Sequence, residues 1–411
     1  MRCPRAINGT EPMNAPRTVS PVHLIRSDAE AIAIATDLAR DFATTAAARD
    51  RDRLLPWEEL DRFSASGLWG ITVPAEFGGA GVSTVTLARV ISILAAADSS
   101  LAQIPQNHFY ALEILRSGGT PAQQAHFNRL ALQGRRFGNA VAEIGRRDFT
   151  RATRLIREEG GLVVQGRKFY CTGAIYAHVI PTLAADEDGK QVMVFLPRDS
   201  EGITITDDWD GFGQRVTGSG SVAFDRVAVE PDWIVPFQAS FERPTPIGPH
   251  AQIMHAAIDL GIGQGAFADM LSFIRDRARP WLDAGVERAQ DDPLTLQGVG
   301  EVAVRLRAAE ALLHRSGRVL DAAIREATEE TVADASIAVA AARALTTEAG
   351  LLAASKLFEL TGTSATLGDE GRDRYWRNVR THTLHDPVRW KYHAVGNHTL
   401  NGVNPPRHGA I

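Results

Sequence analysis

The sequence predicts an α+β protein in which helical domains at the two ends flank a β-barrel domain. The prediction rests on two changes in the spacing of apolar residues along the 411-residue chain. The spacing is helical at first, switches toward the two-residue period of strands, and then returns to long helical runs. We therefore expect a disordered tail over 1–22, an N-terminal helical domain over 23–136, the barrel over 137–240 and a C-terminal four-helix bundle over 241–411.

Capping signals mark helices in the first helical domain. Ser27 followed by Glu30 has the spacing of a capping box, and Thr120 followed by Gln123 repeats that spacing. Between them, the segment 68–81 is rich in glycine and proline and cannot form the interior of a helix.

Turn signals and alternation mark strands in the middle domain. Gly160-Gly161 and Asp188-Gly189 each separate two short apolar runs, which is typical of hairpins. Residues 221–229 continue the alternation, and together these segments predict an all-β unit of about 100 residues.

Two apolar stripes at helical spacing predict long helices in the last domain. The first stripe comprises Val302, Leu306, Ala309, Leu313, Leu320 and Ile324, and the second comprises Ile337, Ala341, Ala344, Leu351 and Phe358. The glycines of 261–265 lack the G-x-G-x-x-G spacing and follow no strand, so we interpret them as helix-packing residues. The chain has no fingerprint for binding NAD(P)H.

Composition and charge exclude several classes of protein. A formal net charge of −5 provides no attraction for nucleic acid or for an anionic membrane. No apolar run approaches the roughly 20 residues needed to span a bilayer, and the first 22 residues contain no apolar segment of a secretory signal. Cys3 and Cys171 alone cannot build a disulfide framework or a cysteine zinc site. We expect a cytoplasmic protein.

Four motifs resemble those of known flavoproteins. The order of the three domains and the segment 73–81 (VPAEFGGAG) resemble the acyl-CoA dehydrogenase superfamily, over about residues 28–403. Three further stretches resemble its dibenzothiophene monooxygenase-like and sulfur-acquisition branch: 104–109 (IPQNHF), 168–174 (KFYCTGA) and 380–396 (RTHTLHDPVRWKYHAVG).

The resemblance implies that four residues of the middle domain contact a flavin ring. Tyr170 would lie over the ring and Thr172 would bond near its N5 atom, although the same residues would also suit an ordinary half-buried strand. Trp209 and Ser219 belong to a glycine-rich loop that matches the active-site loop of the family, or that could be only a hairpin loop.

Two more residues carry the cofactor assignment. Asn139 would lie near the polar edge of the ring, although a lone asparagine is also a common turn residue. Arg277 matches the arginine that grips the flavin phosphates, usually across a subunit boundary, or it could belong to a solvated basic helix face. The residues that follow Arg277 depart from the dehydrogenase pattern, which favours FMN over FAD.

The chain lacks the carboxylate that an acyl-CoA dehydrogenase needs as a base. No Asp or Glu lies between Arg243 and Ile258, and the segment 381–387 contains histidines where the family usually has a glutamate. An imidazole can instead supply a proton to a flavin C4a-hydroperoxide and recover it. We therefore expect His385 and then His108 to be catalytic, with Thr172 as a relay, although either histidine could be a structural residue.

These implications define the expected function. It is a reduced-flavin-dependent monooxygenase that acts on a small organosulfur compound in sulfur acquisition, as a homotetramer supplied with reduced FMN by a separate flavin reductase. The alternatives are an acyl-CoA dehydrogenase with a relocated base, a flavin-dependent N-hydroxylase and a catalytically silent scaffold. We expect no metal, because the only Glu–His pair on a bundle helix, Glu310 and His314, lacks the spacing of a di-iron site.

Overall fold

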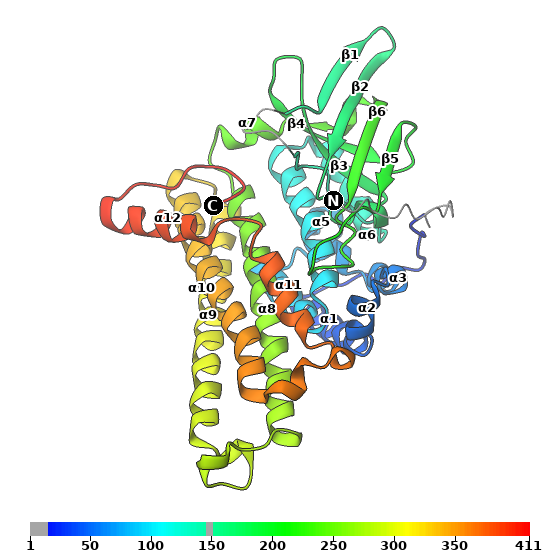
Figure 1. The fold of residues 1–411 in the computed structure, drawn as a ribbon. Helices are drawn as coiled ribbons and strands as arrows, with labels where there is room; N and C mark the ends of the chain where they lie inside the picture. Colours follow the sequence, from blue (N-terminus) through cyan, green and yellow to red (C-terminus); the bar gives the residue numbers. More distant parts are fainter. Residues whose placement is uncertain (1–14, 145–150) are drawn as a thin grey trace.

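The computed structural model describes residues 15–144 and 151–411. A β-sheet domain lies above a set of N-terminal helices, and a bundle of long helices extends beside them (Figure 1). Residues 15–22 form neither helix nor strand. The rest of the predicted tail, residues 1–14, lies outside the described residues.

The N-terminal helices follow the predicted capping signals. They are α1 (Asp28–Ala43), α2 (Ala46–Asp52), α3 (Trp57–Ala65), α4 (Thr84–Ala97), α5 (Ser99–Gly118) and α6 (Pro121–Leu132). Thr120 and Gln123 form a complete capping box at α6. At α1 the Ser27 side chain accepts from the Glu30 amide, but the Glu30 carboxylate turns to the Arg26 amide, so the predicted box is only half formed.

The middle domain is one seven-stranded sheet in the order β5-β6-β2-β1-β3-β4-β7. Its strands are β1 (Arg154–Glu158), β2 (Gly161–Lys168), β3 (Val179–Ala185), β4 (Gln191–Pro197), β5 (Ile203–Thr206), β6 (Ser221–Val229) and β7 (Ile234–Val235). Both predicted hairpins are confirmed by the antiparallel pairs β1–β2 and β3–β4. The sheet is open rather than a closed barrel in the described chain, because β5 and β7 form its two edges.

The C-terminal domain is helical, as predicted. It contains α7 (Phe237–Phe241), α8 (Ile247–Asp276), α9 (Pro293–Arg325), α10 (Glu329–Thr361), α11 (Asp373–His382) and α12 (Val388–Asn401). The first apolar stripe is buried on α9 except for the partly buried Ile324. The second lies on α10, a long helix as predicted, but apart from Ala344 its residues are only half-buried. The helix packs against both α8 and α9, so that buried side chains occupy more than one face.

Glycines allow α8 to approach its neighbours closely, as predicted. A Cβ atom added to Gly261 or Gly265 would lie 2.3 Å from a carbonyl oxygen of α4, that of Ser92 or Ala96. This close contact joins the N-terminal helices to the bundle. Helix α10 is long and apolar enough to cross a membrane, but 67% of its most apolar window is buried inside the protein, as in a core helix.

Candidate active site

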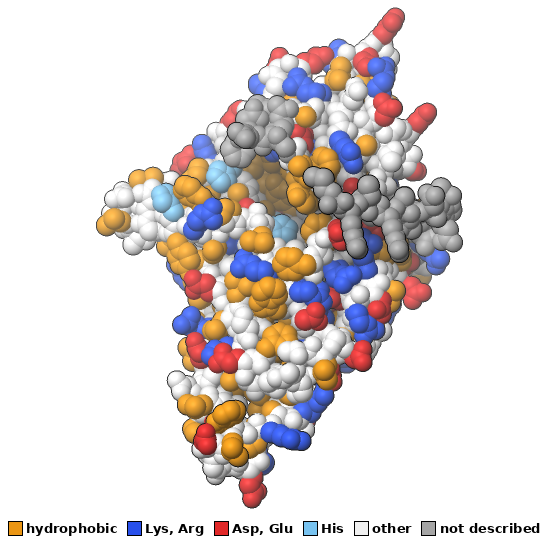
Figure 2. All heavy atoms as spheres, in the orientation of Figure 1, with side chains coloured by type: hydrophobic (Ala, Val, Ile, Leu, Met, Phe, Trp, Pro, Cys, Tyr) orange, Lys and Arg blue, Asp and Glu red, His pale blue; other side chains and the backbone are white. Residues whose placement is uncertain are grey.

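A hollow lies between the sheet domain and the C-terminal helices. Hydrophobic side chains cover its walls and histidine side chains lie at its edge (Figure 2). The side chains that form the candidate site fall into two groups: hydroxyl and aromatic side chains from the sheet domain, and histidines from α8 and the end of α11.

Three hydroxyl groups form the first group. The chain after β2 places Thr172 beside the loop before β6, and the Ser219 hydroxyl lies 2.7 Å from the hydroxyls of both Thr172 and Thr217. All three residues are buried. The structure therefore brings together Thr172 and Ser219, two residues predicted separately, and adds Thr217.

Two predicted aromatic residues lie next to this hydroxyl cluster. Tyr170 is 54% exposed and has a left-handed backbone, with φ of 54°. Its ring meets the half-buried ring of Trp209 edge to face at 6.2 Å between centroids. The Trp209 indole N–H donates to the Gln214 carbonyl at 2.8 Å, which fixes that ring against the loop. An open aromatic face and adjoining hydroxyls suit a flat, polar-edged ring such as a flavin.

Helix α5 connects the sheet-domain residues to the histidines. Gly173, which follows Thr172, packs so closely on α5 that an added Cβ would lie 3.3 Å from the side chain of Ile104. On the neighbouring residue of α5, Gln103, the Nε2 atom lies 3.0 Å from Nε2 of His385. Adjacent residues of one turn of α5 therefore contact the segment next to Thr172 and the His385 ring.

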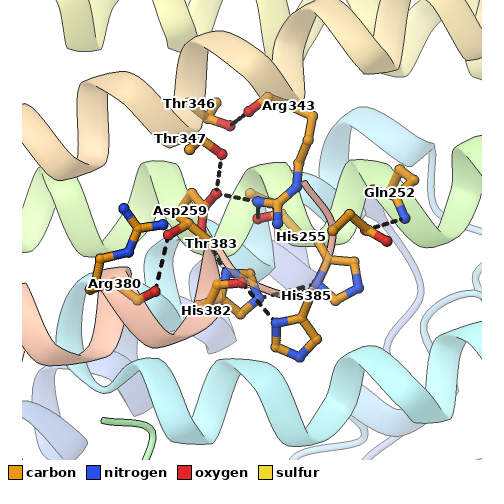
Figure 3. A network of polar contacts seen from close by, with 12 residues as sticks. Gln252, His255, Asp259, Arg343, Thr346, Thr347, Arg380, His382, Thr383 and His385 are labelled. Atoms are coloured by element: carbon orange, nitrogen blue, oxygen red, sulfur yellow. Dashed lines mark hydrogen bonds and ion pairs between the residues drawn. The ribbon is translucent and has the colours of Figure 1, made fainter. Parts of the chain in front are cut away.

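Three histidine rings form the second group. His255 on α8, His382 at the end of α11 and His385 just after it have ring centroids 4.8 to 5.1 Å apart (Figure 3). The rings of His382 and His385 are neighbours although α11 ends at His382. His255 was not predicted.

A buried carboxylate holds His382 from behind. Asp259, one turn after His255 on α8, accepts from the His382 Nδ1–H at 2.5 Å, from the Thr347 hydroxyl at 2.9 Å and from the Arg343 guanidinium (Figure 3). Asp259 has no exposed surface, and burial raises its pKa against the opposing charge of Arg343. With three donors engaged, this carboxylate positions an imidazole and is not free to remove a substrate proton.

The hydrogen-bond partners assign the proton on each ring. Because His382 donates from Nδ1 to Asp259, its Nε2 accepts from the His255 Nδ1–H at 3.1 Å. His385 donates from Nδ1 to the His382 carbonyl at 2.7 Å, which leaves Nε2 as an acceptor facing Gln103. Desolvation lowers the pKa of all three imidazoles, and does so most strongly for His255 and His382. The His385 ring belongs to the same histidine cluster, although its side chain is exposed.

The prediction that His108 is catalytic is wrong. Its ring is completely buried; Nε2–H donates to the Trp69 carbonyl at 2.8 Å and Nδ1 accepts from the Phe137 amide at 3.1 Å. With both nitrogens bonded to the backbone and the pKa lowered by desolvation to about 3, the ring cannot exchange protons near neutral pH. His108 instead fastens α5 to the first residues of the sheet domain.

The remaining cofactor-binding predictions are Arg277 and Asn139. Arg277, at the end of α8, is partly exposed, pairs with Glu370 at 2.8 Å and lies over the ring of Phe273. Its predicted role across a subunit boundary needs a second subunit. Asn139 is half-buried on a segment that forms isolated bridges to β3 and to Phe169, just after β2, rather than a continuous strand.

The end of the chain also borders the site. Gln252, one turn before His255, donates to the Gly409 carbonyl at 2.8 Å and to the Asp386 carboxylate at 2.9 Å, while Ile411 is buried. The Asp386 carboxylate faces Gln252, and Pro387 occupies the N-cap position of α12.

The facing nitrogens of the three histidines lie within 4.8 Å of one another, a spacing that could hold a metal ion. Two of their lone pairs already accept hydrogen bonds: His382 from His255, and His385 from Gln103. In the described part of the chain, the side chains of Ser99, Gln214 and Thr381 have buried, uncharged polar atoms without partners, which suit the polar edge of an organic ring better than a metal ion.

Comparisons with known proteins agree with this architecture. Residues 30–135 match the acyl-CoA dehydrogenase N-terminal domain model and residues 253–390 match the C-terminal domain model. Dibenzothiophene monooxygenase of Rhodococcus erythropolis is 34% identical over 92% of this chain and 95% of its own. The probable FMNH2-dependent monooxygenase SfnC of Pseudomonas putida is 34% identical over 96% of this chain and 98% of its own.

A solved structure shows the same likeness in three dimensions. FMN-bound TdsC from Paenibacillus sp. A11-2 superimposes with a TM-score of 0.89 at 31% identity, and the match covers 93% of this chain and all of that one. The resemblance found in the sequence motifs is thereby confirmed. The chain belongs to the acyl-CoA dehydrogenase family, in the branch of dibenzothiophene monooxygenase and SfnC.

Proposed function

We propose that the protein is a reduced-FMN-dependent monooxygenase that adds one oxygen atom to the sulfur of a small organosulfur compound, in sulfur acquisition. The observation that carries the proposal is an open imidazole, His385, where a dehydrogenase would need a free carboxylate. The nearest buried carboxylate, Asp259, is held by three donors and cannot serve as that base. The relatives named above support the choice of FMN and of sulfur.

The residues of the sheet domain would hold the cofactor. Thr172 and Ser219 offer hydroxyls to the polar edge of the ring, Tyr170 and Trp209 offer aromatic surface, and Asn139 offers an amide from the adjoining segment. Arg277 would bind the phosphate of FMN held by a neighbouring subunit, because a guanidinium fork matches a phosphate group. When bound, reduced FMN supplies two electrons to dioxygen, so that one oxygen atom enters the substrate and the other leaves as water.

His385 would manage the proton that this reaction needs. Its Nδ1–H is committed to the His382 carbonyl, so the ring can give up a proton and recover it only at Nε2, on the side of Gln103. Asp259 keeps His382 in a fixed tautomer, and His382 in turn fixes His385 through the backbone. Hydrophobic walls around the hollow would exclude water that competes with the substrate.

The assembly is part of the proposal. We propose a cytoplasmic homotetramer that receives reduced FMN from a separate flavin reductase. Apolar side chains on the outer faces of the long helices support further packing between subunits, for example Leu294 at 72% exposed and Leu400 at 84%. The half-buried residues of α10 belong to the same helical domain.

The decisive experiment supplies chemically reduced FMN and measures dioxygen uptake with a panel of sulfides, sulfoxides, sulfones and amines. The proposal requires one oxygenated product for each dioxygen consumed with a sulfur compound, and no reaction without added reduced FMN. Oxidation of amines alone would make the protein an N-hydroxylase. Anaerobic bleaching of oxidised flavin by an acyl-CoA would make it a dehydrogenase, and failure to bind flavin in either redox state would leave only a scaffold role.

A further inference from the structure

Gln103 is the side chain that meets the exchangeable nitrogen of His385. It lies in the first half of α5, is 3% exposed, and places its amide nitrogen 3.0 Å from the His385 Nε2 atom. Because the other ring nitrogen donates to the His382 carbonyl, any proton gained by His385 must appear in the Gln103 contact. The amide therefore has to accommodate an acceptor in one state of the ring and a donor in the other.

An amide side chain can meet both requirements. Its NH2 group donates to an unprotonated Nε2, and its carbonyl oxygen accepts from a protonated Nε2–H. Within the residues that the structure describes, Oε1 of Gln103 is buried and has no hydrogen-bond partner. A half-turn about the terminal bond would exchange the two groups and give this unpaired oxygen a charged donor.

We propose that Gln103 is a positioning residue that reverses its amide as His385 changes protonation, and so stabilises the ring in both states. The inference rests on the proposed role of His385 in proton transfer. The property it concerns, the proton affinity of that ring, exists in the flavin-free protein and is measured there independently of any activity.

Other groups around His385 also determine its proton affinity. They are His255 and Asp259 from α8, Arg343 from α10, His382 from α11, Asp386 just before α12, and Lys391 on α12. Burial and the charge of Arg343 lower the pKa of His385, whereas the His382 carbonyl and the two carboxylates raise it. Substitutions at Gln103 leave all of these groups in place, so a change in the pKa reports on the amide.

Two variants of similar size separate the roles of the amide. Gln103→Glu provides a permanent charged acceptor, which favours protonated His385 and should raise its pKa by about one unit, a tenfold change in proton affinity. Gln103→Met removes both the donor and the acceptor. Because a hydrogen bond to a charged ring is stronger than one to a neutral ring, this loss should lower the pKa by about half a unit.

The test labels the flavin-free protein with diethyl pyrocarbonate, which acylates only unprotonated imidazole, from pH 5 to 9. Peptide mass spectrometry then gives the rate at His385, which is exposed, separately from that at the buried His382. The midpoint of the rate against pH is the pKa of His385. Gln106→Met, the same change one turn further along α5 at another buried glutamine, is the matched control and should leave the midpoint unchanged.

The inference is supported if the pKa of His385 rises in Gln103→Glu and falls in Gln103→Met. The pH at which hydrogen peroxide replaces oxygenated product should shift in the same directions. Equal midpoints in all four proteins, or shifts in the same direction, would overturn it, whether or not the protein oxidises sulfur compounds. If Gln103→Met does not fold, the direction of the shift in Gln103→Glu still decides the question. An upward shift in the pKa with no oxygenation of any substrate would instead retain the inference and reject the proposed function.

Discussion

Removing the charge of Asp259 should destabilise the protein strongly, because its partner would remain buried. The side chains of Asp259 and Arg343 are 0% and 2% exposed, respectively, and the pair lies in the centre of the helical domain. Breaking a buried ion pair by changing one partner typically costs about 3–5 kcal/mol, since the other charge is left without compensation. We therefore expect Asp259→Asn to lower the free energy of unfolding by about 3–5 kcal/mol, even though asparagine can still accept from Thr347 and His382.

A double-mutant cycle tests this reasoning. Arg343→Met alone should cost a similar amount, but Asp259→Asn combined with Arg343→Met should cost much less than the sum, because no unpaired charge remains. Urea unfolding followed by far-ultraviolet circular dichroism measures all four proteins. Lys356→Met, at an ion pair on the surface, is the control and should barely move the midpoint. Additive effects of the two buried substitutions would refute the account of the network.

Three further results are expected. Thr172→Val keeps the shape of the side chain but loses its hydroxyl, and should weaken binding of reduced FMN by about 1 kcal/mol, or roughly fivefold, in anaerobic titration; unchanged affinity would remove Thr172 from the cofactor site. His108→Leu leaves the Trp69 carbonyl and the Phe137 amide unpaired, which should lower the free energy of unfolding in urea by about 1–3 kcal/mol for each group. The amount of product formed per dioxygen should not change. A decrease in that ratio would restore a catalytic role for His108. Burial lowers the pKa of His108, His255 and His382 in the folded protein. Below about pH 6.5 the unfolded chain therefore binds more protons than the folded protein. The free energy of unfolding should fall by up to about 1.4 kcal/mol per pH unit for each ring as the pH decreases from there. Urea midpoints that do not change between pH 7.5 and 5.5 would contradict that linkage.

Local patterns were sufficient to predict the order of the domains. The switch from a helical to a two-residue period, the capping residues near Thr120 and the hairpin glycines each depend on neighbours in the sequence, and the structure contains the corresponding elements. The stripe predicted the helix α10 but not which of its residues are buried, because that helix packs against α8 and α9 together and no single face separates core from surface. A period calculation cannot describe a helix with several buried faces.

The candidate site was predictable only where motifs carried it. Thr172, Ser219 and His385 lie in distinctive segments; the structure brings the hydroxyls of Thr172 and Ser219 together and places His385 against Gln103. Asp259 was not predicted, because it directly follows the stretch 243–258 that contains no Asp or Glu. Its partner His382 is also 123 residues away in the sequence. A single Asp within the apolar run 256–262 was the available signal, since a buried carboxylate requires a partner.

His108 shows the opposite error. It lies within one of the motifs that indicated the family, and its ring is only five residues from Gln103, which does reach His385. Whether a side chain on this helix reaches the core or the active site depends on the direction in which it points. The His108 ring points toward the core, where backbone groups bond to both of its nitrogens. Membership of a motif did not distinguish these two orientations.

The most direct test of the central claim replaces His385 by alanine and follows the fate of dioxygen. With reduced FMN, dioxygen and an organosulfur substrate, the account predicts that the variant still binds the flavin and still consumes dioxygen. Its yield should shift from oxygenated product to hydrogen peroxide, because His385 is the one exposed imidazole of the three-histidine cluster and the two that remain are buried. A variant that forms as much product per dioxygen as the unmodified protein would contradict the account.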